Sequence, residues 1–470
     1  MSAAPIQIVW FRQDLRTADQ AALAAAAASG AVLPIYVFDD ETPGEDRMGA
    51  AQRWWLHHSL ADLQSGLAAL GAPLILRRGR AADVLAMLAA ETGATSVHAL
   101  RHHEPWWRRA EEELARRVPL RLHHGAQLCD PRAIRNGSGA RYRVFTPWFE
   151  RLLALMPPPP PAPAPARLEA PAALPITERL EDWNLRPRAP DWATGFDVWT
   201  PGEAGARAVF DAFLPRVADY EIERNFPSDS GVSRLSPHIH FGEISPATLW
   251  TQAEGPASRA FLRELAWREY GLNLVDQFPD YARRNGRVLF DRFPWRTGPA
   301  ADADFRAWTR GRTGYPAVDA AMRELWGTGW MHNRLRMVAA SFLVKHLLID
   351  WRRGERWFWD TLLDADRGAN AMNWQYVAGS GVDAPVFSRI MAPVLQSRKF
   401  EMAGYIRRFV PELAHLGDAV IHAPHEIGAA PPDYPSPIVS HPFARGRALA
   451  AWNSARGSSA PTEATLFDLL

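Results

Sequence analysis

Carboxylates and tryptophans that could act together gather in the second half of this 470-residue chain. Glu264 and Trp267 are three residues apart, so a helix would direct both side chains the same way. Asp364 and Asp366 come shortly before Trp374. Taken alone, Glu264 predicts a salt bridge to a nearby arginine, and the two aspartates are typical of solvated loops. The tryptophans fit an aromatic core, or rings that hold a planar cofactor or unstacked bases.

Composition excludes several classes of protein. One cysteine, Cys129, excludes a disulfide framework, a cysteine zinc site and a protein-held iron–sulfur cluster. Neither lysine, Lys345 nor Lys399, lies in a P-loop, and the sequence contains no His-Glu-x-x-His or Gly-x-Ser-x-Gly motif. A formal net charge of +1 argues against a field that draws the whole protein onto nucleic acid, but it allows a local basic cleft. Adjacent histidines in strands or helices point apart, so we expect no metal site.

Apolar periodicity divides the chain into parts of different character. Short apolar runs alternate with helix-like stretches in the first 130 residues, which predicts βαβ units and a parallel sheet. The run PPPPPAPAP at 157–165 predicts an extended linker. The longest apolar run, 21–38, is broken by glycine and proline, which favours a soluble cytoplasmic protein over a membrane span. The parts are an α/β domain at 1–135, a linker at 136–205, a helical domain at 206–420 and a weakly ordered tail at 421–470.

Five longer segments carry the most specific pattern. They are WFRQDLRTADQAAL at 10–23, GVSRLSPHIHFG at 231–242, FLRELAWREY at 261–270, GYPAVDAAMRELWGTGWMHNRLRM at 314–337 and DADRGANAMNWQYVAGSGVDAPVFSRIMAPVLQ at 364–396. In this order they resemble the photolyase/cryptochrome family of blue-light flavoproteins, nearest to class I-like photolyases that act on cyclobutane pyrimidine dimers. The resemblance implies a Rossmann-like antenna domain with a parallel sheet, a long linker and an all-helical domain that holds FAD.

The resemblance also implies which residues bind FAD. The segment 233–236 is similar to the family's FAD-phosphate loop, although Val232 replaces the usual threonine. Asp364 is implied to pair with Arg336 beside the flavin, since a buried carboxylate requires a partner. Asn370 matches the asparagine that faces flavin N5 in photolyases, where plant cryptochromes have aspartate. The implied set is Tyr220, Val232, Ser233, Arg234, Leu235, Ser236, Phe261, Glu264, Arg268, Asn333, Arg336, Asp364, Ala365, Asp366 and Asn370.

Substrate and electron-transfer positions follow from the same resemblance. Glu264 is implied to hydrogen-bond the thymine carbonyls and Trp267 to stack on the dimer, while Asn333, Met337 and Asn370 complete the implied catalytic set. The implied electron chain between flavin and surface is Trp374, Trp351 and Trp295. The implied DNA contacts are Arg224, Trp267, Arg334, Tyr376, Gln396, Arg398 and Lys399, with Tyr376 standing where close relatives have a second tryptophan.

The implied activity is light-driven repair of cyclobutane pyrimidine dimers, by electron transfer from excited, reduced FAD to a flipped-out dimer in UV-damaged DNA, without sequence readout. The alternative is a cryptochrome-like photoreceptor that signals by flavin photoreduction. Asn370 and Glu264 favour repair. For a second, antenna chromophore, the region around Trp106 and Trp107 favours a deazaflavin or FMN type, or none, over folate. We expect a monomer with no membrane partner.

Overall fold

A five-stranded parallel sheet forms the centre of the N-terminal domain in this computed structural model, which describes residues 4–229, 231–387 and 389–457. The strands are β1 (Ile6–Phe11), β2 (Ala31–Phe38), β3 (Ile75–Arg78), β4 (Ser96–Leu100) and β5 (Leu120–His123), in the order β3-β2-β1-β4-β5. Strand β2 is buried along its whole length, as expected where helices cover both faces of a parallel sheet. The predicted parallel sheet is therefore confirmed.

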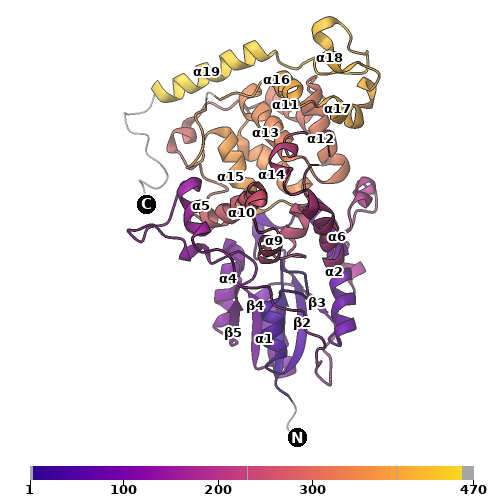
Figure 1. Cartoon of the computed structure of the whole chain (residues 1–470), viewed down its shortest axis with the longest axis vertical. Helices are drawn as coiled ribbons and strands as arrows, with labels where there is room; N and C mark the ends of the chain where they lie inside the picture. The colour runs from indigo at the N-terminus through magenta and orange to yellow at the C-terminus, as the bar shows by residue number, and fades with distance from the viewer. Residues whose placement is uncertain (1–3, 230, 388, 458–470) are drawn as a thin grey trace.

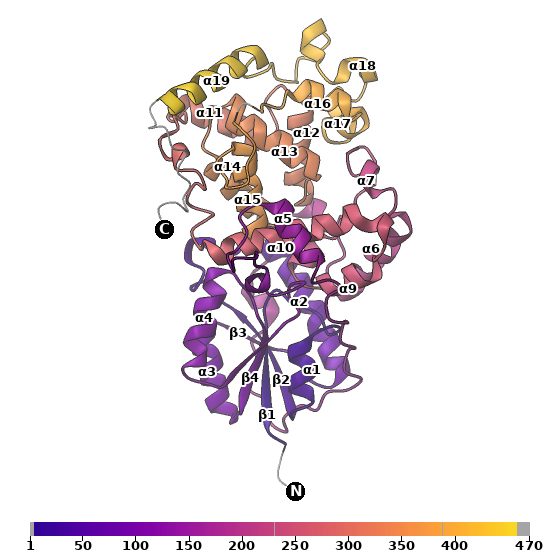
Figure 2. The ribbon, with the colours of Figure 1, turned by 60° about the vertical axis from the view of Figure 1, so that its left-hand side comes forward.

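Helices cover the two faces of this sheet (Figure 2). On one side lie α1 (Ala21–Ala27) and α2 (Ala50–Leu70), and on the other lie α3 (Ala81–Thr92) and α4 (Pro105–Ala115). Alternate residues of β1 enter different cores: Val9 and Phe11 pack with α1 and α2, whereas Ile8 and Trp10 pack with α3 and α4. This is the period-two alternation of a strand buried on both faces.

The region expected to be a linker leads from the sheet to the helical domain. It contains α5 (Phe145–Leu153) and two short 3-10 turns, Leu180–Trp183 and Thr194–Val198. The proline run at 157–165 forms neither helix nor strand. The backbone N–H of Leu168 donates to the carbonyl of Leu70 at 2.7 Å, so this segment runs along the α/β domain.

A helical domain lies above the sheet domain in Figure 1. Its helices are α6 (Glu203–Phe213), α7 (Tyr220–Glu223), α8 (Ser236–His240), α9 (Pro246–Gln252), α10 (Arg259–Gln277), α11 (Pro299–Thr309), α12 (Pro316–Thr328), α13 (Asn333–Ser341), α14 (Trp351–Thr361), α15 (Arg367–Ala378), α16 (Pro393–Lys399) and α17 (Ala403–Phe409). Among the described residues, no helix is both long and apolar enough to cross a membrane.

Helices α10 and α15 cross where a glycine on each meets the other's backbone. A Cβ atom added to Gly271 would lie 2.8 Å from the carbonyl carbon of Gly368, and one added to Gly368 would lie 2.5 Å from that of Gly271. Real Cβ atoms essentially never come so close to backbone atoms. Two glycines therefore set the spacing of these helices, which carry most of the chemically interesting side chains.

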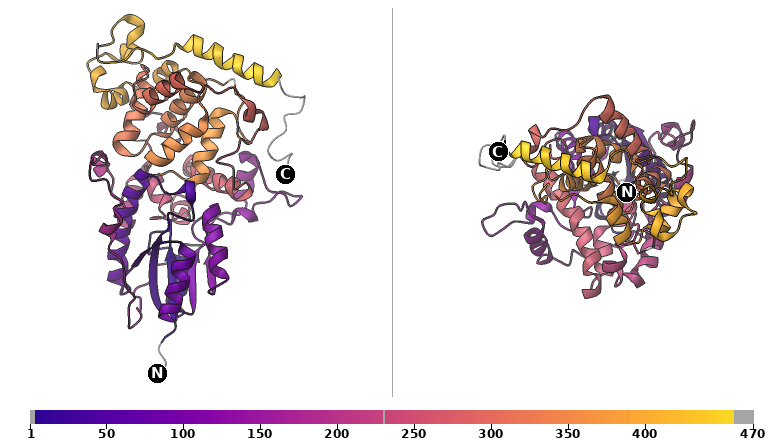
Figure 3. Two further views of the ribbon diagram at one scale, coloured as in Figure 1. Left: turned by 180° about the vertical axis from the view of Figure 1, so that it is seen from behind. Right: turned by 90° about the horizontal axis from the view of Figure 1, so that it is seen from above.

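The region after residue 420 differs from the weakly ordered tail that we expect from its prolines. It contains the end of α18 (Asp418–Ile421) and the 17-residue helix α19 (His441–Gly457), which lies across the helical domain (Figure 3). The ring of Trp452 stacks on Phe290 and Phe387 with centroids 5.8 and 5.5 Å apart. The prolines precede or begin this helix, and the alanines and arginines beyond them favour helix. Residues 458–470 of the expected tail lie outside the described residues.

The two domains are joined by one buried carboxylate at the end of α10. Asp276 accepts from Arg132 at 2.9 Å, Arg141 at 3.0 Å, His103 at 3.3 Å and Arg108 at 3.5 Å. Burial alone would raise the pKa of Asp276, but the hydrogen bonds from His103, Arg132 and Arg141 lower it below its ordinary value. Because these partners come from the sheet domain and from the segment that follows it, the ionised carboxylate anchors α10 to both.

Replacing Asp276 with Asn should lower the free energy of unfolding by ~2–3 kcal/mol at pH 7, because the arginines around it lose the buried anion that they share. The carboxylate's contribution is complete above its unfolded pKa of 3.8 and is lost as the pH falls from there through the lower folded pKa. Urea unfolding at pH 7 and pH 3.5 measures both effects. The exposed Asp280→Asn variant is the control, and equal losses in the two variants would contradict this role.

Candidate functional site

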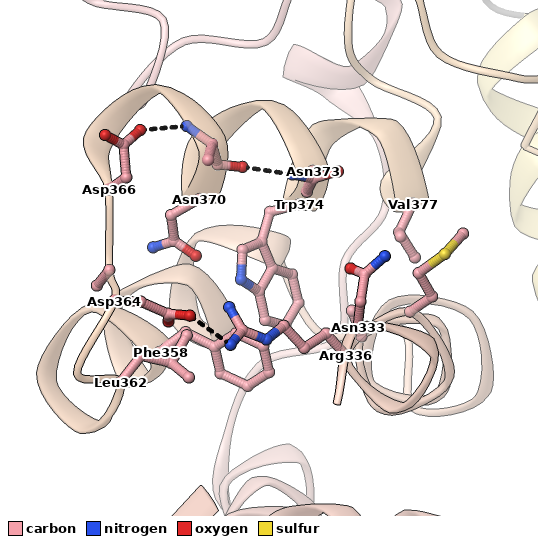
Figure 4. A pocket seen from close by; sticks show the side chains of 14 residues that line it. Asn333, Arg336, Phe358, Leu362, Asp364, Asp366, Asn370, Asn373, Trp374 and Val377 are labelled. Atoms are coloured by element: carbon pink, nitrogen blue, oxygen red, sulfur yellow. Dashed lines mark hydrogen bonds and ion pairs between the residues drawn. The ribbon is translucent and has the colours of Figure 1, made fainter. Parts of the chain in front are cut away.

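A deep cavity lies between the loop before α8 and the helices α10, α13 and α15. It holds about 1080 Å³ of empty space, part of it open to solvent. A second, narrower pocket adjoins it and shares Asn333, Arg336, Asp364 and Asp366 with it (Figure 4). Every residue that the sequence suggests for FAD lines one of the two, with Ala365 and Asn370 in the narrower pocket. The fold thus brings together residues spread from 220 to 370.

The loop 233–236 has the form that a phosphate-binding turn requires. Arg234 adopts a left-handed conformation with φ of 55°, and α8 begins directly after it at Ser236. No side chain caps α8, so neither serine serves as the helix cap that a serine before a helix usually provides. The hydroxyl of Ser236 accepts from the indole Nε1 of Trp330 at 3.1 Å. Backbone N–H groups and hydroxyls of such a turn can bind a pyrophosphate.

Two buried polar atoms in the cavity wall have no partner in the described part of the chain. Asp364 accepts from Arg336 at 2.8 Å through Oδ2, as expected, but its Oδ1 is unpartnered. The Nε of Arg268 is likewise buried without a partner. Leaving such groups unsatisfied costs about 1–3 kcal/mol each, so the cavity calls for a polar ligand. FAD, with hydroxyls, phosphates and ring nitrogens along its length, fits this wall.

Asn370 is held by a residue that the sequence does not single out. Its amide nitrogen donates to the side-chain Oε1 of Glu355 at 3.0 Å and to the Glu355 carbonyl at 3.1 Å. Both amide protons are therefore committed, and the amide oxygen is the polar atom left for the cavity. Burial raises the pKa of Glu355 to about 6, against the attraction of Arg367. Asp366 supports the same helix by accepting from the Ala369 N–H at 2.7 Å.

On the opposite wall, α10 presents Glu264 and Trp267 to the larger cavity. Glu264 accepts from Arg224 at 2.5 Å, whereas Arg268 bonds its neighbour Glu269 at 2.9 Å. The partner of Glu264 is thus an arginine 40 residues away in sequence. The Trp267 ring stacks on Phe145 of α5, with centroids 3.4 Å apart and planes 7° apart. One face of Trp267 is covered by a ring that sequence reasoning does not identify.

The three tryptophans of the expected electron chain occupy different environments. Trp374 is buried, lines the narrower pocket and packs against Phe358, with ring centroids 5.0 Å apart. Trp351 is fully buried and donates from Nε1 to Asn285 at 2.9 Å. Trp295 is only partly buried, with its ring centroid 4.5 Å from that of Phe293. Of the three, only Trp295 is partly exposed, which fits a path that ends near the surface.

The expected DNA contacts separate into two groups. Trp267 lines the larger cavity, and Arg224 bonds Glu264 in its wall. Arg334 bonds Asn225 and lies 4.2 Å over the Phe400 ring. Tyr376, which is half-buried on α15, lies outside both pocket walls. Three residues of α16 also lie outside them: Gln396, Arg398 and Lys399. Arg398 is 3.7 Å from Glu426. A DNA strand that contacted all of these residues would extend beyond the mouth of the larger cavity.

Comparison with known proteins agrees with this geometry. The family model described as the FAD binding domain of DNA photolyase matches residues 261–454, and that described as DNA photolyase matches 7–166. A deoxyribodipyrimidine photo-lyase of Agrobacterium fabrum is 45% identical over 96% of this chain and 98% of its own length. The chain belongs to the photolyase/cryptochrome family. The FAD-binding model covers α10, α13 and α15, which form much of the cavity wall.

Relatives of both kinds resemble the chain. The crystal structure of a class III photolyase from Agrobacterium tumefaciens is 44% identical, with a TM-score of 0.92 and coverage of 97% of this chain and 99% of that one. A Synechocystis cryptochrome structure is 27% identical, with a TM-score of 0.85 and coverage of 96% and 100%. Cryptochrome-2 of Arabidopsis thaliana is 36% identical over 89% of this chain and 72% of its own. The family includes repair enzymes and photoreceptors, so features of the site must decide between these two functions.

Replacing Gly354 with Ala should impair light-driven flavin reduction, because a Cβ atom there would overlap the Trp374 ring. A displacement of ~1 Å is enough to cost about 10-fold or more in a geometry-dependent step. The rate of loss of flavin absorbance under blue light measures the effect. Gly327→Ala is the matched control, since its Cβ would meet no neighbour within 4 Å. Equal rates in both variants would show that Trp374 does not limit reduction.

Proposed function

We propose that this chain is a deoxyribodipyrimidine photo-lyase that uses blue light to repair cyclobutane pyrimidine dimers in UV-damaged DNA. The proposal rests on Asn370, a neutral amide whose N–H groups are held by Glu355 and whose oxygen remains for the flavin-side pocket. An aspartate here could hold a proton near flavin N5, whereas an amide cannot. The site therefore favours a fully reduced flavin, which suits electron donation better than signalling.

The chemistry supplied by bound, reduced FAD is donation of one electron to the dimer under blue light and its recovery after the ring has split. The residues of this chain bind and orient. Ser233 and Ser236 offer hydroxyls to the pyrophosphate, and the Arg336–Asp364 pair offers an unpartnered carboxylate oxygen to a buried polar group. Asn370 presents its amide oxygen, as expected from the family.

On the substrate side, Glu264 and Trp267 hold the dimer. The second face of Trp267, opposite Phe145, is the one that can stack on an unstacked pyrimidine. Arg224 and Glu264, 2.5 Å apart, form a charge-assisted pair beside this face. An ionised carboxylate only accepts hydrogen bonds, so Glu264 donates to a thymine carbonyl when it carries a proton, and Arg224 donates in either state. Both groups stabilise charge that develops on the dimer. Asn333 and Met337, on the wall of the narrower pocket, complete the substrate positions.

DNA is held outside the cavity by its phosphates. Arg334, Arg398 and Lys399 are the proposed grip, with Tyr376 and Gln396 beside it, and no base readout is needed. A dimer is poorly stacked in its duplex, which lowers the cost of turning it into the cavity. We propose that a monomer is sufficient for this reaction.

A second chromophore would lie at the carboxyl end of the sheet, where a hollow is walled by Tyr36, Trp106, Trp107 and Trp359. The Trp107 ring already packs edge-on against Trp10, with centroids 5.9 Å apart. An archaeal photolyase structure, 26% identical, contains two FAD molecules and is described as implying a novel light-harvesting cofactor. We propose that a ligand here, where present, is of the deazaflavin or FMN type rather than folate.

The decisive experiment is to mix the protein, reduced chemically, with dimer-containing DNA under blue light and to measure thymine monomers. We expect monomers from the wild type, and ~5- to 150-fold weaker binding of the damaged strand by Trp267→Ala, because base–ring stacking contributes about 1–3 kcal/mol. Trp326→Ala, which removes an exposed tryptophan elsewhere, is the control. If no monomers form from the chemically reduced protein, although a separate oxidised sample photoreduces under the same light, the repair proposal is wrong and the photoreceptor alternative is favoured.

Changing Trp351 to Phe should block light-driven flavin reduction but leave repair intact once FAD has been reduced chemically. The reason is that the tryptophan relays electrons to the flavin and has no part in the repair cycle. Flavin absorbance and monomer yield measure the two effects in the same sample. Trp326→Phe serves as the matched control. Loss of repair after chemical reduction would place Trp351 in a role other than electron relay.

A further inference from the structure

A second hollow lies behind the loop that faces the flavin cavity. It holds about 1560 Å³ of empty space, part of it open to solvent. The two hollows share only Val232–Arg234 and Trp330 among their described wall residues, so this loop and ring separate them. The remaining wall includes residues of α6, the turn at 227–229, α17, the segment 198–200, and Glu324 and His332. Nothing in the proposed repair reaction uses it.

Two arginines face this hollow without an ion-pair partner in the described part of the chain. The Arg234 guanidinium lies 4.2 Å from the ring centroid of Trp199 and 5.2 Å from that of Trp330, which fixes its position. Arg408 enters from α17, and both arginines are exposed. The charges of Glu324 and Arg408 act on Arg234 in opposite directions. Two neighbouring cations without ion-pair partners make the hollow electropositive.

A buried histidine in the same wall has a hydrogen-bond donor without an acceptor. The Nδ1 atom of His332 accepts from the backbone N–H of Arg334 at 3.1 Å, so the ring proton of the neutral form lies on Nε2. Burial lowers the pKa of His332 to about 4, which keeps the ring neutral at pH 7. Its Nε2 is buried without a partner, and the residue is 3% exposed. His332 lines this hollow and not the flavin cavity.

The acidic groups nearby do not neutralise the two arginines. Glu324 accepts from the Tyr405 hydroxyl at 2.6 Å and from the His332 backbone N–H at 3.2 Å. Burial raises its pKa, which weakens its negative charge. Asp229 lies on the wall as one remaining carboxylate. The other wall residues include the apolar Val209, Ala212 and Phe213. The hollow therefore offers positive charge, one buried N–H donor and an apolar wall.

We propose that this hollow binds a small organic phosphate of the nucleoside monophosphate class. The phosphate oxygens accept from Arg234, Arg408 and the Nε2–H of His332, and the organic part lies against Val209 and Ala212. A phosphate fixed in a DNA strand at the surface is a poorer match, because the His332 donor is buried. This site goes beyond the proposed repair activity. Because the two hollows share the loop at Arg234, any effect of occupancy on FAD affinity is matched by an equal effect of FAD on this site.

Isothermal titration of the FAD-saturated protein with uridine monophosphate, in the dark, tests the proposal. We expect uridine monophosphate to bind about 10-fold or more tightly than uridine, because the charged groups recognise phosphate. Arg408→Gln should weaken binding by about 10-fold for loss of one charge-assisted contact. Ala212→Trp should fill the hollow and abolish binding. Flavin absorbance before and after titration confirms that each variant is folded and that FAD stays bound.

Two matched variants show which cavity the ligand occupies. Arg407→Gln changes the adjacent arginine, which pairs with Asp418, and should leave binding unchanged. Arg224→Gln removes the partner of Glu264 in the flavin cavity and should also leave nucleotide binding unchanged. The proposal is overturned if uridine monophosphate binds no better than uridine. It is also overturned if Arg224→Gln weakens uridine monophosphate binding as much as Arg408→Gln does. A third outcome would also overturn it: the protein does not bind the nucleotide, and Arg408→Gln loses affinity for undamaged duplex DNA. That result would assign the site to the DNA backbone.

Discussion

The geometry of the site depends on one close contact, the crossing of α10 and α15 at Gly271 and Gly368. A glycine inside a helix costs about 1 kcal/mol relative to alanine, so two of them at the crossing need a compensating gain. The gain is that the two helix backbones can meet. Trp267 lies one helical turn before the first glycine and Asn370 lies two residues after the second. The substrate wall and the flavin wall are therefore held at a distance fixed by backbone contact, which no rotamer change can alter.

Besides crossing α15, helix α10 connects the site to the sheet domain. Its beginning carries Glu264 and Trp267, its middle crosses α15, and its end places Asp276 among cations of the sheet domain and the segment after it. A helix fixed at its middle and at one end cannot shift along its axis. The buried carboxylate thus connects the packing of the antenna domain with the position of the substrate wall. Its desolvation is compensated because several hydrogen-bond donors surround it.

The sequence predicts the helices and strands better than it predicts the contacts between their side chains. Strand patterns predict the sheet, and helical periodicity predicts the second half, because both depend on local alternation. The FAD set follows from resemblance, since all of those residues except Tyr220 lie within the quoted motifs. Glu355 and Phe145 could not be found in this way, because their importance depends on pairing with residues distant in sequence or on another helix. The arginine that bonds Glu264 comes from α7's end for the same reason, and α19 emerges from a region whose prolines suggest no helix.

The distinction between repair and signalling depends on α14 as much as on Asn370. Consecutive residues of α14 serve two neighbours on α15: Gly354 leaves room for the Trp374 ring, and Glu355 holds the amide of Asn370. The amide and the first tryptophan of the electron path are one helical turn apart, so both are set by the same helix–helix contact. A change on α14 that moved the tryptophan would also release the amide. The packing of α14 on α15 therefore links the position of Trp374, the first tryptophan of the proposed electron path, with the orientation of the Asn370 amide.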